Sequence, residues 1–256
     1  MIEIQPGVVF ECLVGAHNQA KDLTTGIVRV APRVKLAYHT HPTAESITLL
    51  AGAGVVEVEG RRYRLSRLHN VVVPTGIAHS VENTSRDCEA SFHIAFPTDA
   101  PAREFAESRY RTTLMPDDST GPGTPGLERV NRLNLGEGYD AGPGVTFIDF
   151  FNDDVMRGID MSGGYGLFWS CCRLPAHIHD FDESICIVEG TADCVVEGRQ
   201  YSMSGYCTAL QPRGRVHYFL NDGLKPMAMI WVYAGPRPEW IVVDERNATS
   251  EGNPWQ

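Results

Sequence analysis

Two short stretches of this 256-residue chain decide its fold, and each carries two histidines and a glutamate at the same spacing. The first is HTHPTAE, residues 39–45, and the second is HIHDFDE, residues 177–183. Residues i and i+2 of a β-strand project from the same face, so the two histidines of each stretch can face one interior. Each stretch therefore predicts a strand that directs two imidazoles and, after a turn, one carboxylate toward a single point.

Both stretches belong to an internal repeat. Residues 39–83 align without a gap on residues 177–221 at a constant offset of 138, and 16 of the 45 aligned positions are identical. The identical positions beyond the two stretches include Pro74/Pro212, Gly76/Gly214, His79/His217 and Asn83/Asn221. A period this long is typical of a duplicated domain and not of a solenoid. The chain is therefore predicted to contain two copies of one domain.

The composition indicates a globular, acidic protein. Hydrophobic residues make up 43% of the chain, and 22 Lys and Arg against 32 Asp and Glu give a net charge of −10. These values exclude disorder and argue against a nucleic-acid-binding surface, which needs clustered cations. The chain shows no basic signal-peptide start, no apolar run long enough to span a membrane, and seven cysteines without paired spacing. We expect a cytoplasmic protein with reduced thiols and no membrane partner.

Short strands separated by Gly and Pro dominate the expected secondary structure. The expected strands are 26–36, 45–50, 55–59, 71–73 and 91–96 in the first copy, and 166–174, 183–188, 194–197, 208–210 and 227–233 in the second. Short strands at even spacing predict an all-β sandwich or barrel.

The repeat also predicts where the domains begin and end. We expect an N-terminal barrel over residues 1–100, a connecting segment over 101–143 and a C-terminal barrel over 144–256. Within the connecting segment, residues 101–113 could form one amphipathic helix. Residues 115–126 are rich in Pro, Gly, Ser and Asp and are predicted to form an exposed linker.

Each copy contains four candidate metal ligands. A third histidine follows the Pro-x-Gly turn and can reach the same point as the first two histidines and the glutamate. The predicted ligands are His39, His41, Glu45 and His79 in the first copy, and His177, His179, Glu183 and His217 in the second. Six of the nine histidines of the chain occupy these positions. Three imidazoles and one carboxylate suit Fe(II), Mn(II), Ni(II) or Zn(II), with coordination positions left open for substrate.

With these residues the sequence resembles the cupin superfamily. The motifs G-x5-H-x-H-x3,4-E-x6-G and G-x5-P-x-G-x2-H-x3-N occur in both copies, but the leading glycine of each is replaced, by Arg33, Leu68, Cys171 and Tyr206. These departures concern turn geometry and not the ligands. The resemblance to a two-domain cupin implies two tandem jelly-roll β-barrels with one divalent transition metal in each. Cupins commonly dimerise, so a homo-oligomer is also expected.

Two arginines in the second copy are candidates for binding an anionic substrate. Arg173 lies four residues before His177, and Arg215 lies two residues before His217. On regular strands both would face the interior, where a guanidinium can hold a carboxylate or enolate oxygen. A surface arginine at the barrel rim is the alternative for each. Together with nearby aromatic residues, these two predicted catalytic residues favour the second barrel as the catalytic one.

Three kinds of function agree with such a site. Substrate and dioxygen bound together predict a dioxygenase acting on a small enol, diketone or phenolic substrate. A metal that acts only as a Lewis acid predicts a non-redox lyase, isomerase or hydrolase. A site without turnover predicts a module that binds small molecules. We rank the dioxygenase first, which favours Fe(II) and makes the protein an oxidoreductase, although the ligand set is the same for the first two.

Overall fold

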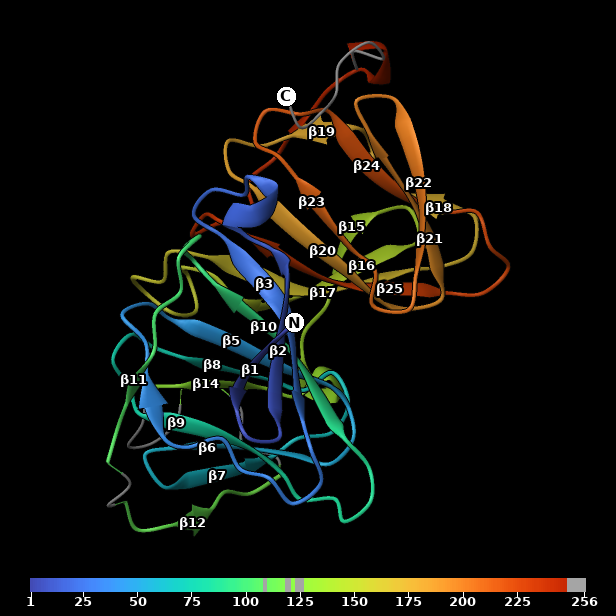
Figure 1. Cartoon of the computed structure of the whole chain (residues 1–256). Coiled ribbons are helices and arrows are strands. Elements are labelled where there is room, and N and C mark those ends of the chain that lie inside the picture. Colours follow the sequence, from blue (N-terminus) through green and yellow to red (C-terminus); the bar gives the residue numbers. More distant parts are fainter. Residues whose placement is uncertain (108–109, 118–120, 123–126, 248–256) are drawn as a thin grey trace. The chain divides into compact units, whose positions relative to one another are not determined.

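The computed structural model describes residues 1–107, 110–117, 121–122 and 127–247 (Figure 1). The chain divides into two compact units. The N-terminal unit comprises Met1–Leu13 and Thr24–Gly136, and the C-terminal unit comprises Val14–Leu23 and Glu137–Gln256. The described residues form strands and three short 3-10 helices, η1 (Ala16–Asn18), η2 (Leu133–Leu135) and η3 (Glu245–Asn247). No helix in the described part of the chain is both long and apolar enough to cross a bilayer.

Two sheets make up the N-terminal unit. The larger sheet has, in spatial order, β1 (Ile2–Gln5), β2 (Val8–Val14), β3 (Thr24–Val30), β10 (Ala90–Phe96), β5 (Glu45–Ala51), β8 (Asn70–Val73), β14 (Arg129–Asn131) and β13 (Gly121–Pro122). The smaller sheet has β11 (Glu104–Phe105), β4 (His39–Thr40), β9 (His79–Asn83), β6 (Gly54–Val58), β7 (Arg61–Arg64) and β12 (Thr113–Leu114).

The C-terminal unit repeats this arrangement. One sheet has, in spatial order, β15 (Tyr139–Gly142), β16 (Val145–Phe151), β17 (Ser162–Phe168), β25 (Met227–Tyr233), β20 (Glu183–Glu189) and β23 (Thr208–Gln211). The other has β22 (Arg199–Ser204), β21 (Thr191–Val196), β24 (His217–Asn221), β19 (His177–Ile178) and β26 (Ile241–Val242), and β18 (Cys172–Arg173) also pairs with β24.

The strand order is the same in both units. The order β3–β10–β5–β8 of the first corresponds to β17–β25–β20–β23 of the second, and β4–β9–β6–β7 corresponds to β19–β24–β21–β22. The register is also repeated, because Glu45 pairs with Val73 where Glu183 pairs with Gln211. The predicted all-β fold of two tandem jelly-roll barrels is thus confirmed.

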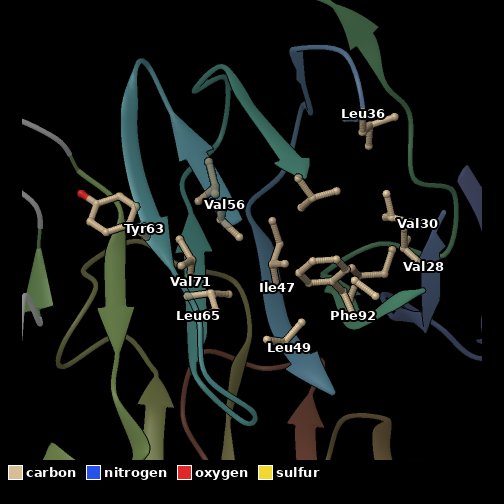
Figure 2. Packing of buried hydrophobic residues seen from close by; sticks show 14 of the residues in the cluster. Val28, Val30, Leu36, Ile47, Leu49, Val56, Tyr63, Leu65, Val71 and Phe92 are labelled. Atoms are coloured by element: carbon tan, nitrogen blue, oxygen red, sulfur yellow. The ribbon is translucent and has the colours of Figure 1, made fainter. Parts of the chain in front are cut away.

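Alternate residues of facing strands meet inside the N-terminal barrel (Figure 2). Ile47 and Leu49 of β5 and Phe92 of β10 pack with Val56 and Tyr63 of the other sheet, and all five are buried. This alternation follows from the two-residue period of a strand. Burying one such side chain contributes about 1.5–3 kcal/mol. The apolar core therefore holds together the two sheets whose strands carry the histidines.

The four positions where the cupin motifs lack their leading glycine keep the backbone conformation of glycine. Arg33, Leu68, Cys171 and Tyr206 have φ values of 61°, 64°, 58° and 67°. This left-handed region costs a residue with a Cβ atom about 1–2 kcal/mol. The turns therefore keep their shape even though their sequence differs, and the surrounding strands impose the conformation.

The connecting segment differs from its prediction. The described part of residues 101–113 contains no helix; instead, β11 pairs with β4 and β12 pairs with β7. Sheet edges offer unpaired backbone groups, whereas a short isolated helix is only marginally stable, so strand pairing wins. Of the linker predicted over 115–126, residues 118–120 and 123–126 lie outside the described residues. Gly121–Pro122 of that linker forms β13, which pairs with β14.

Candidate metal centres

Each barrel holds one cluster of three histidines and one glutamate. In each cluster, one ligand atom from every residue lies within 4.8 Å of the others, and all the side chains are buried. The clusters consist of His39, His41, Glu45 and His79, and of His177, His179, Glu183 and His217. The eight residues predicted from the two motifs are thus brought together in two sites.

Three strands and one turn build the N-terminal cluster. β4 places His39 directly opposite His79 of β9, and Glu45 begins β5. His41 follows β4, and its carbonyl oxygen accepts a hydrogen bond of 2.9 Å from the backbone N–H of Gly76. Gly76 has a φ of 73°, which favours glycine. The Pro-x-Gly turn of the second motif therefore fixes the loop that carries a ligand of the first.

The C-terminal cluster is built in the same way. β19 places His177 opposite His217 of β24, and Glu183 begins β20. Gly214, also with a φ of 73°, donates its N–H to the carbonyl of His179 at 2.8 Å. The spacing that the two copies share in sequence thus corresponds to one set of backbone contacts.

One type of hydrogen bond orients all six imidazoles. Each Nδ1 lies 2.5–2.9 Å from a backbone carbonyl oxygen, and since a carbonyl only accepts, each Nδ1 carries the hydrogen and donates it. The accepting carbonyls belong to Ala37, Ala102, Ile77, Pro175, Phe181 and Arg215. In a neutral ring the lone pair is then on Nε2, as metal coordination requires.

The Nε2 atoms meet a carboxylate at short range. In the N-terminal cluster, Nε2 of His79 lies 2.6 Å and Nε2 of His41 lies 3.3 Å from Oε2 of Glu45. In the other cluster, Nε2 of His217 lies 3.3 Å from Oε2 of Glu183. Lone pairs this close repel one another unless a cation lies between them. The buried Nε2 atoms of His41 and His217 also lack hydrogen-bond partners among the described residues, so the donor set fits a divalent metal.

Electrostatics keep four of the eight ligands in their metal-binding forms. Burial lowers the pKa of His39 and of His177 to about 3, so both rings are neutral near pH 7. Burial by itself would raise the pKa of Glu45, but the neighbouring imidazoles, first among them His41, outweigh it and hold that pKa well below its usual range. The same balance places the pKa of Glu183 at about 2. Both carboxylates are therefore ionised.

A cavity of about 160 Å³ opens onto the N-terminal cluster. Three ligands, His39, His41 and Glu45, line it together with one cation, Arg103. The remaining walls are formed by Ile4, Phe10, Val28, Leu36, Ile94, Phe96, Pro101 and Ala102. The cavity is thus mainly apolar, with one charged group beside the metal ligands.

Arg103 is a fixed cation with an unused donor. Its Nη2 donates to the carbonyl of Ile4 at 2.9 Å, and its guanidinium lies 5.2 Å from the ring centroid of Phe105. Its Nη1 is buried and has no hydrogen-bond partner in the described part of the chain. Burial lowers the pKa of Arg103, and the Glu45 carboxylate partly offsets this, so the guanidinium remains charged.

The cavity beside the C-terminal cluster has a different character. It has a volume of about 170 Å³ and is lined by Tyr139, Asp140, Ala141, Phe147, Leu174, His177, Trp231, Tyr233, Pro238 and Trp240. The Tyr139 hydroxyl donates to Oδ1 of Asp149 at 3.0 Å, and burial raises the pKa of both groups. The ring centroid of Trp240 lies 4.3 Å from that of His177. This cavity is therefore largely aromatic, and Tyr139 in its wall carries a protonated hydroxyl.

The structure does not place Arg173 in the interior. Its side chain is 44% exposed, forms an ion pair with Glu245 at 2.6 Å and lies over the ring of Tyr218. Tyr218 follows the ligand His217 on β24, so its side chain is on the outer face of the sheet. The prediction of an inward-facing Arg173 is therefore wrong. Strand alternation fails because Pro175 separates β18 from β19.

Arg215 contributes its backbone to the site. Its carbonyl oxygen accepts the Nδ1–H of His217 at 2.8 Å, and the residue is half-buried. A role for its guanidinium in binding substrate stays a prediction.

Two residues that the sequence reasoning missed line the cavities. Arg103 and Tyr139 both come from the connecting segment, outside the 45 aligned positions of the repeat. Neither has a counterpart at the offset of 138 that would have drawn attention to it. Residues 101–113, which include Arg103, instead fit the pattern of one amphipathic helix.

Fold and site together define a class: a protein of two jelly-roll barrels, each with a centre of three histidines and one glutamate that can bind a metal. The family model of the cupin domain matches twice, over residues 26–96 and 172–233. These two matches cover more than half of the chain, which therefore belongs to the cupin family. No curated protein sequence matches it.

Solved structures with the same fold include enzymes of different reaction classes. The formate complex of oxalate decarboxylase from Lactobacillus farciminis has a TM-score of 0.73 and 16% identity, covering 98% of this chain and 88% of that chain. An oxalate decarboxylase mutant from Bacillus subtilis has a TM-score of 0.72 and 15% identity, covering 94% of this chain and 76% of that chain. A mutant of salicylate 1,2-dioxygenase from Pseudoaminobacter salicylatoxidans, in complex with gentisate, has a TM-score of 0.69 and 14% identity, covering 84% of this chain and 69% of that chain. At these identities the likeness concerns the fold.

Proposed function

We propose that this chain is a metal-dependent dioxygenase acting on a small enol or phenolic carboxylate, with the N-terminal barrel as its catalytic centre. One observation carries the proposal: Arg103 lines the cavity that contains His39, His41 and Glu45, and within the described residues its buried Nη1 has no hydrogen-bond partner. This arrangement moves the expected arginine anchor from the second barrel to the first.

The restrained guanidinium of Arg103 supports the proposal that the substrate is negatively charged. A guanidinium held by Ile4 and Phe105 loses little freedom when it binds a carboxylate, and a charge-assisted hydrogen bond is stronger than a neutral one. The cavity, at about 160 Å³, is smaller than the roughly 300–1,000 Å³ of pockets that hold drug-sized ligands. Both features favour a small anionic substrate over a large or neutral one.

The apolar walls support an oxygen-dependent reaction. A metal bound to these ligands would supply Lewis-acid polarisation and, if redox-active, reaction with O2. Residues such as Phe10, Leu36 and Phe96 exclude water from the substrate. Apart from the ligands and Arg103, no described residue lining this cavity has an ionisable side chain. This favours a reaction that needs no general acid from the cavity wall, and we take Fe(II) as the metal.

A non-oxidative decarboxylase or other lyase is the second candidate, with the C-terminal barrel as its centre. Loss of CO2 leaves a carbanion that needs a proton, and Tyr139, hydrogen-bonded to Asp149, lies in the wall of that cavity. The predicted role of Arg215 in holding a substrate anion would belong to this candidate, although Arg215 is not among the residues that line the cavity. The likeness to oxalate decarboxylase supports this candidate as much as the likeness to salicylate dioxygenase supports the first.

Oxygen uptake and CO2 release, measured together, test the proposal. The chain would be loaded with Fe(II) and supplied with salicylate, gentisate or oxalate. We expect O2 consumption that depends on substrate and disappears in His41→Ala but not in His179→Ala. CO2 release without O2 uptake, abolished only in His179→Ala, would support the second candidate and contradict the first.

A substitution of Arg103 tests the proposed substrate contact more directly than the loss of a metal ligand does. Arg103→Met keeps the length and apolar stem of the side chain and removes its charge. Hydrogen bonds to charged groups contribute about 1.5–3 kcal/mol, so kcat/KM should fall about 10- to 100-fold. Arg173→Ala, on the outer face, is the matched control and should leave kcat/KM unchanged. An Arg103→Met variant with unchanged kcat/KM would remove the basis of the proposal.

We also keep the predictions of a cytoplasmic location and of a homo-oligomer. None of the seven cysteines forms a disulfide, which supports the first, because a reducing compartment maintains thiols.

A further inference from the structure

A second cavity of the C-terminal unit lies away from its metal ligands. It has a volume of about 470 Å³, and none of the four ligands lines it. Apolar side chains from three strands form its floor, namely Cys194 and Val196 of β21, Met203 of β22, and Ala209 and Leu210 of β23. Asn18 and Gln19, at the end of η1, form another wall. We call this cavity the β22–β23 groove.

The same place in the N-terminal unit is filled by another strand of the chain. There β14 pairs antiparallel with β8, so that Arg129 lies opposite Val72 and Val130 opposite Val71. Val130 belongs to the apolar core of that unit and is 1% exposed. Since β8 corresponds to β23 at the offset of 138, β14 occupies the position that no described strand fills beside β23.

A buried carboxylate anchors this covering strand. Glu128, two residues before Val130, is fully buried and accepts hydrogen bonds from Nε and Nη2 of Arg61 at 2.6 and 2.9 Å. The hydroxyl of Tyr63 donates to the same carboxylate at 2.5 Å. Arg61 and Tyr63 stand on β7 and form a receptor for one acidic residue, while the core receives the aliphatic residue two positions later.

The C-terminal unit keeps the arginine and the tyrosine, but in its described part no acidic side chain is bound to them. Arg199 and Tyr201 of β22 are identical to Arg61 and Tyr63 at the offset of 138. Tyr201 is 41% exposed where Tyr63 is 1% exposed, and Arg199 is exposed as well. Within the described residues, neither the Arg199 guanidinium nor the Tyr201 hydroxyl has a hydrogen bond or ion pair. In the same part of the chain, β23 pairs only with β20.

We propose that the β22–β23 groove binds an extended segment of a partner protein, with an acidic residue placed two positions before a β-branched aliphatic residue. The acidic residue is bound by Arg199 and Tyr201, the aliphatic side chain enters the apolar groove, and the segment pairs with the open edge of β23. This is strand addition to a sheet edge, in which backbone hydrogen bonds provide affinity and side-chain pockets provide specificity.

Charge complementarity, and the fact that the chain's own matching segment is already bound, select this occupant. Arg199 favours a carboxylate, and the apolar floor favours an aliphatic side chain, as Glu128 and Val130 show in the N-terminal unit. The matching segment of this chain is already buried in its own unit, so the occupant is a separate protein and not a second copy. The proposal does not depend on which reaction the metal centres perform.

A labelled synthetic peptide tests the proposal directly. The peptide carries residues 124–134 of this chain, TPGLERVNRLN, and its binding to the full-length protein is followed by fluorescence anisotropy. We expect saturable binding that weakens at least tenfold when the glutamate of the peptide is replaced by glutamine. Arg199→Ala should weaken binding of the original peptide by a similar factor. Arg157→Ala, an exposed arginine of the same unit, is the matched control and should bind the peptide normally.

Cysteine protection locates the bound peptide. Cys207 is exposed and lines the groove, whereas the exposed Cys88 and Cys171 do not. Bound peptide should slow the alkylation of Cys207 severalfold and leave the other two unchanged. Tyr201→Phe provides a second, milder variant, and the metal content of each variant shows whether its barrel is folded.

Three outcomes would overturn the proposal. The first is no saturable binding at millimolar peptide by a folded, metal-loaded protein. The second is equal affinity for the glutamate and glutamine peptides, which would leave the groove as a general apolar surface. The third is a dimer that Arg199→Ala dissociates while the peptide fails to bind, which would assign the groove to a second copy of the chain.

Discussion

The two barrels share their metal ligands and differ in nearly everything that surrounds them. The N-terminal cluster faces an apolar cavity with one arginine, whereas the C-terminal cluster faces aromatic rings, among them Tyr139, whose hydroxyl donates to Asp149. The edge strand β8 is covered by β14, whereas its counterpart β23 has no partner strand beyond β20 in the described residues. Duplication has therefore kept the machinery that binds a metal and has changed what each barrel presents to a ligand or partner.

Removal of one ligand per barrel should have the largest effect. His41→Ala and His179→Ala each delete one imidazole from a buried set of four, so each variant should retain one metal per chain where the parent protein binds two. Metal content by atomic emission, measured on both variants and on the double variant, checks this. A single variant that loses all its metal would show that only one barrel binds it.

A substitution in the contact that anchors the strand covering β8 should lower the free energy of unfolding far more than a substitution at the corresponding exposed position near the uncovered edge strand β23. Glu128→Ala leaves the buried guanidinium of Arg61 without its partner, and breaking a buried ion pair costs about 3–5 kcal/mol. Arg199→Ala at the exposed counterpart should change the free energy of unfolding by less than about 0.5 kcal/mol. Urea unfolding of the two variants measures both. Similar losses for the two variants would contradict the contrast between the edges.

His93 should make the N-terminal unit sensitive to acid. It is 1% exposed, neither ring nitrogen has a hydrogen-bond partner in the described part of the chain, and burial lowers its pKa to about 4. Between that value and its ordinary pKa of 6.5, the unfolded chain binds a proton that the folded unit does not. Stability is therefore fully present above about pH 6.5 and falls, by about 1.4 kcal/mol per pH unit, as the pH drops toward about 4.

The C-terminal unit supplies the control for this pH effect. By strand register, Ile230 of β25 stands where His93 stands on β10, because Thr48 pairs with His93 and Cys186 with Ile230. His93→Ile should reduce the fall in stability between about pH 6.5 and 4, followed as the thermal midpoint across that range. An unchanged pH dependence in His93→Ile would assign the acid sensitivity to other groups.

Glycine substitutions in the strained turns should have the smallest effect on stability. Arg33 and Cys171 are exposed and have φ values of 61° and 58°. Glycine relieves a left-handed strain of about 1–2 kcal/mol but adds entropy to the unfolded chain, so Arg33→Gly and Cys171→Gly should each stabilise by less than about 1 kcal/mol. Arg33→Ala should give no such gain. Calorimetry that shows lower thermal midpoints for both glycine variants would mean that these side chains stabilise their turns.

The ligands were predictable because their geometry is local. His39 and His41 lie two residues apart next to a strand, and the second motif supplies a turn that reaches His79, so short spacings carry most of the information. Arg173 was misplaced for the complementary reason: strand alternation predicts a face only while the strand continues, and Pro175 ends it. The sequence could not indicate that Arg173 would pair with Glu245 on the outer face.

The sequence by itself determined the duplication, the all-β barrels and the eight residues of the two metal clusters, because these depend on contacts repeated at one offset. Only the tertiary structure decided what surrounds each cluster. Arg103 comes from a segment outside the repeat, and it reaches its cavity because that segment pairs with a sheet edge instead of forming a helix. Such long-range strand pairing is chosen by which edges remain open in the folded barrel, and a local pattern of residues does not record that.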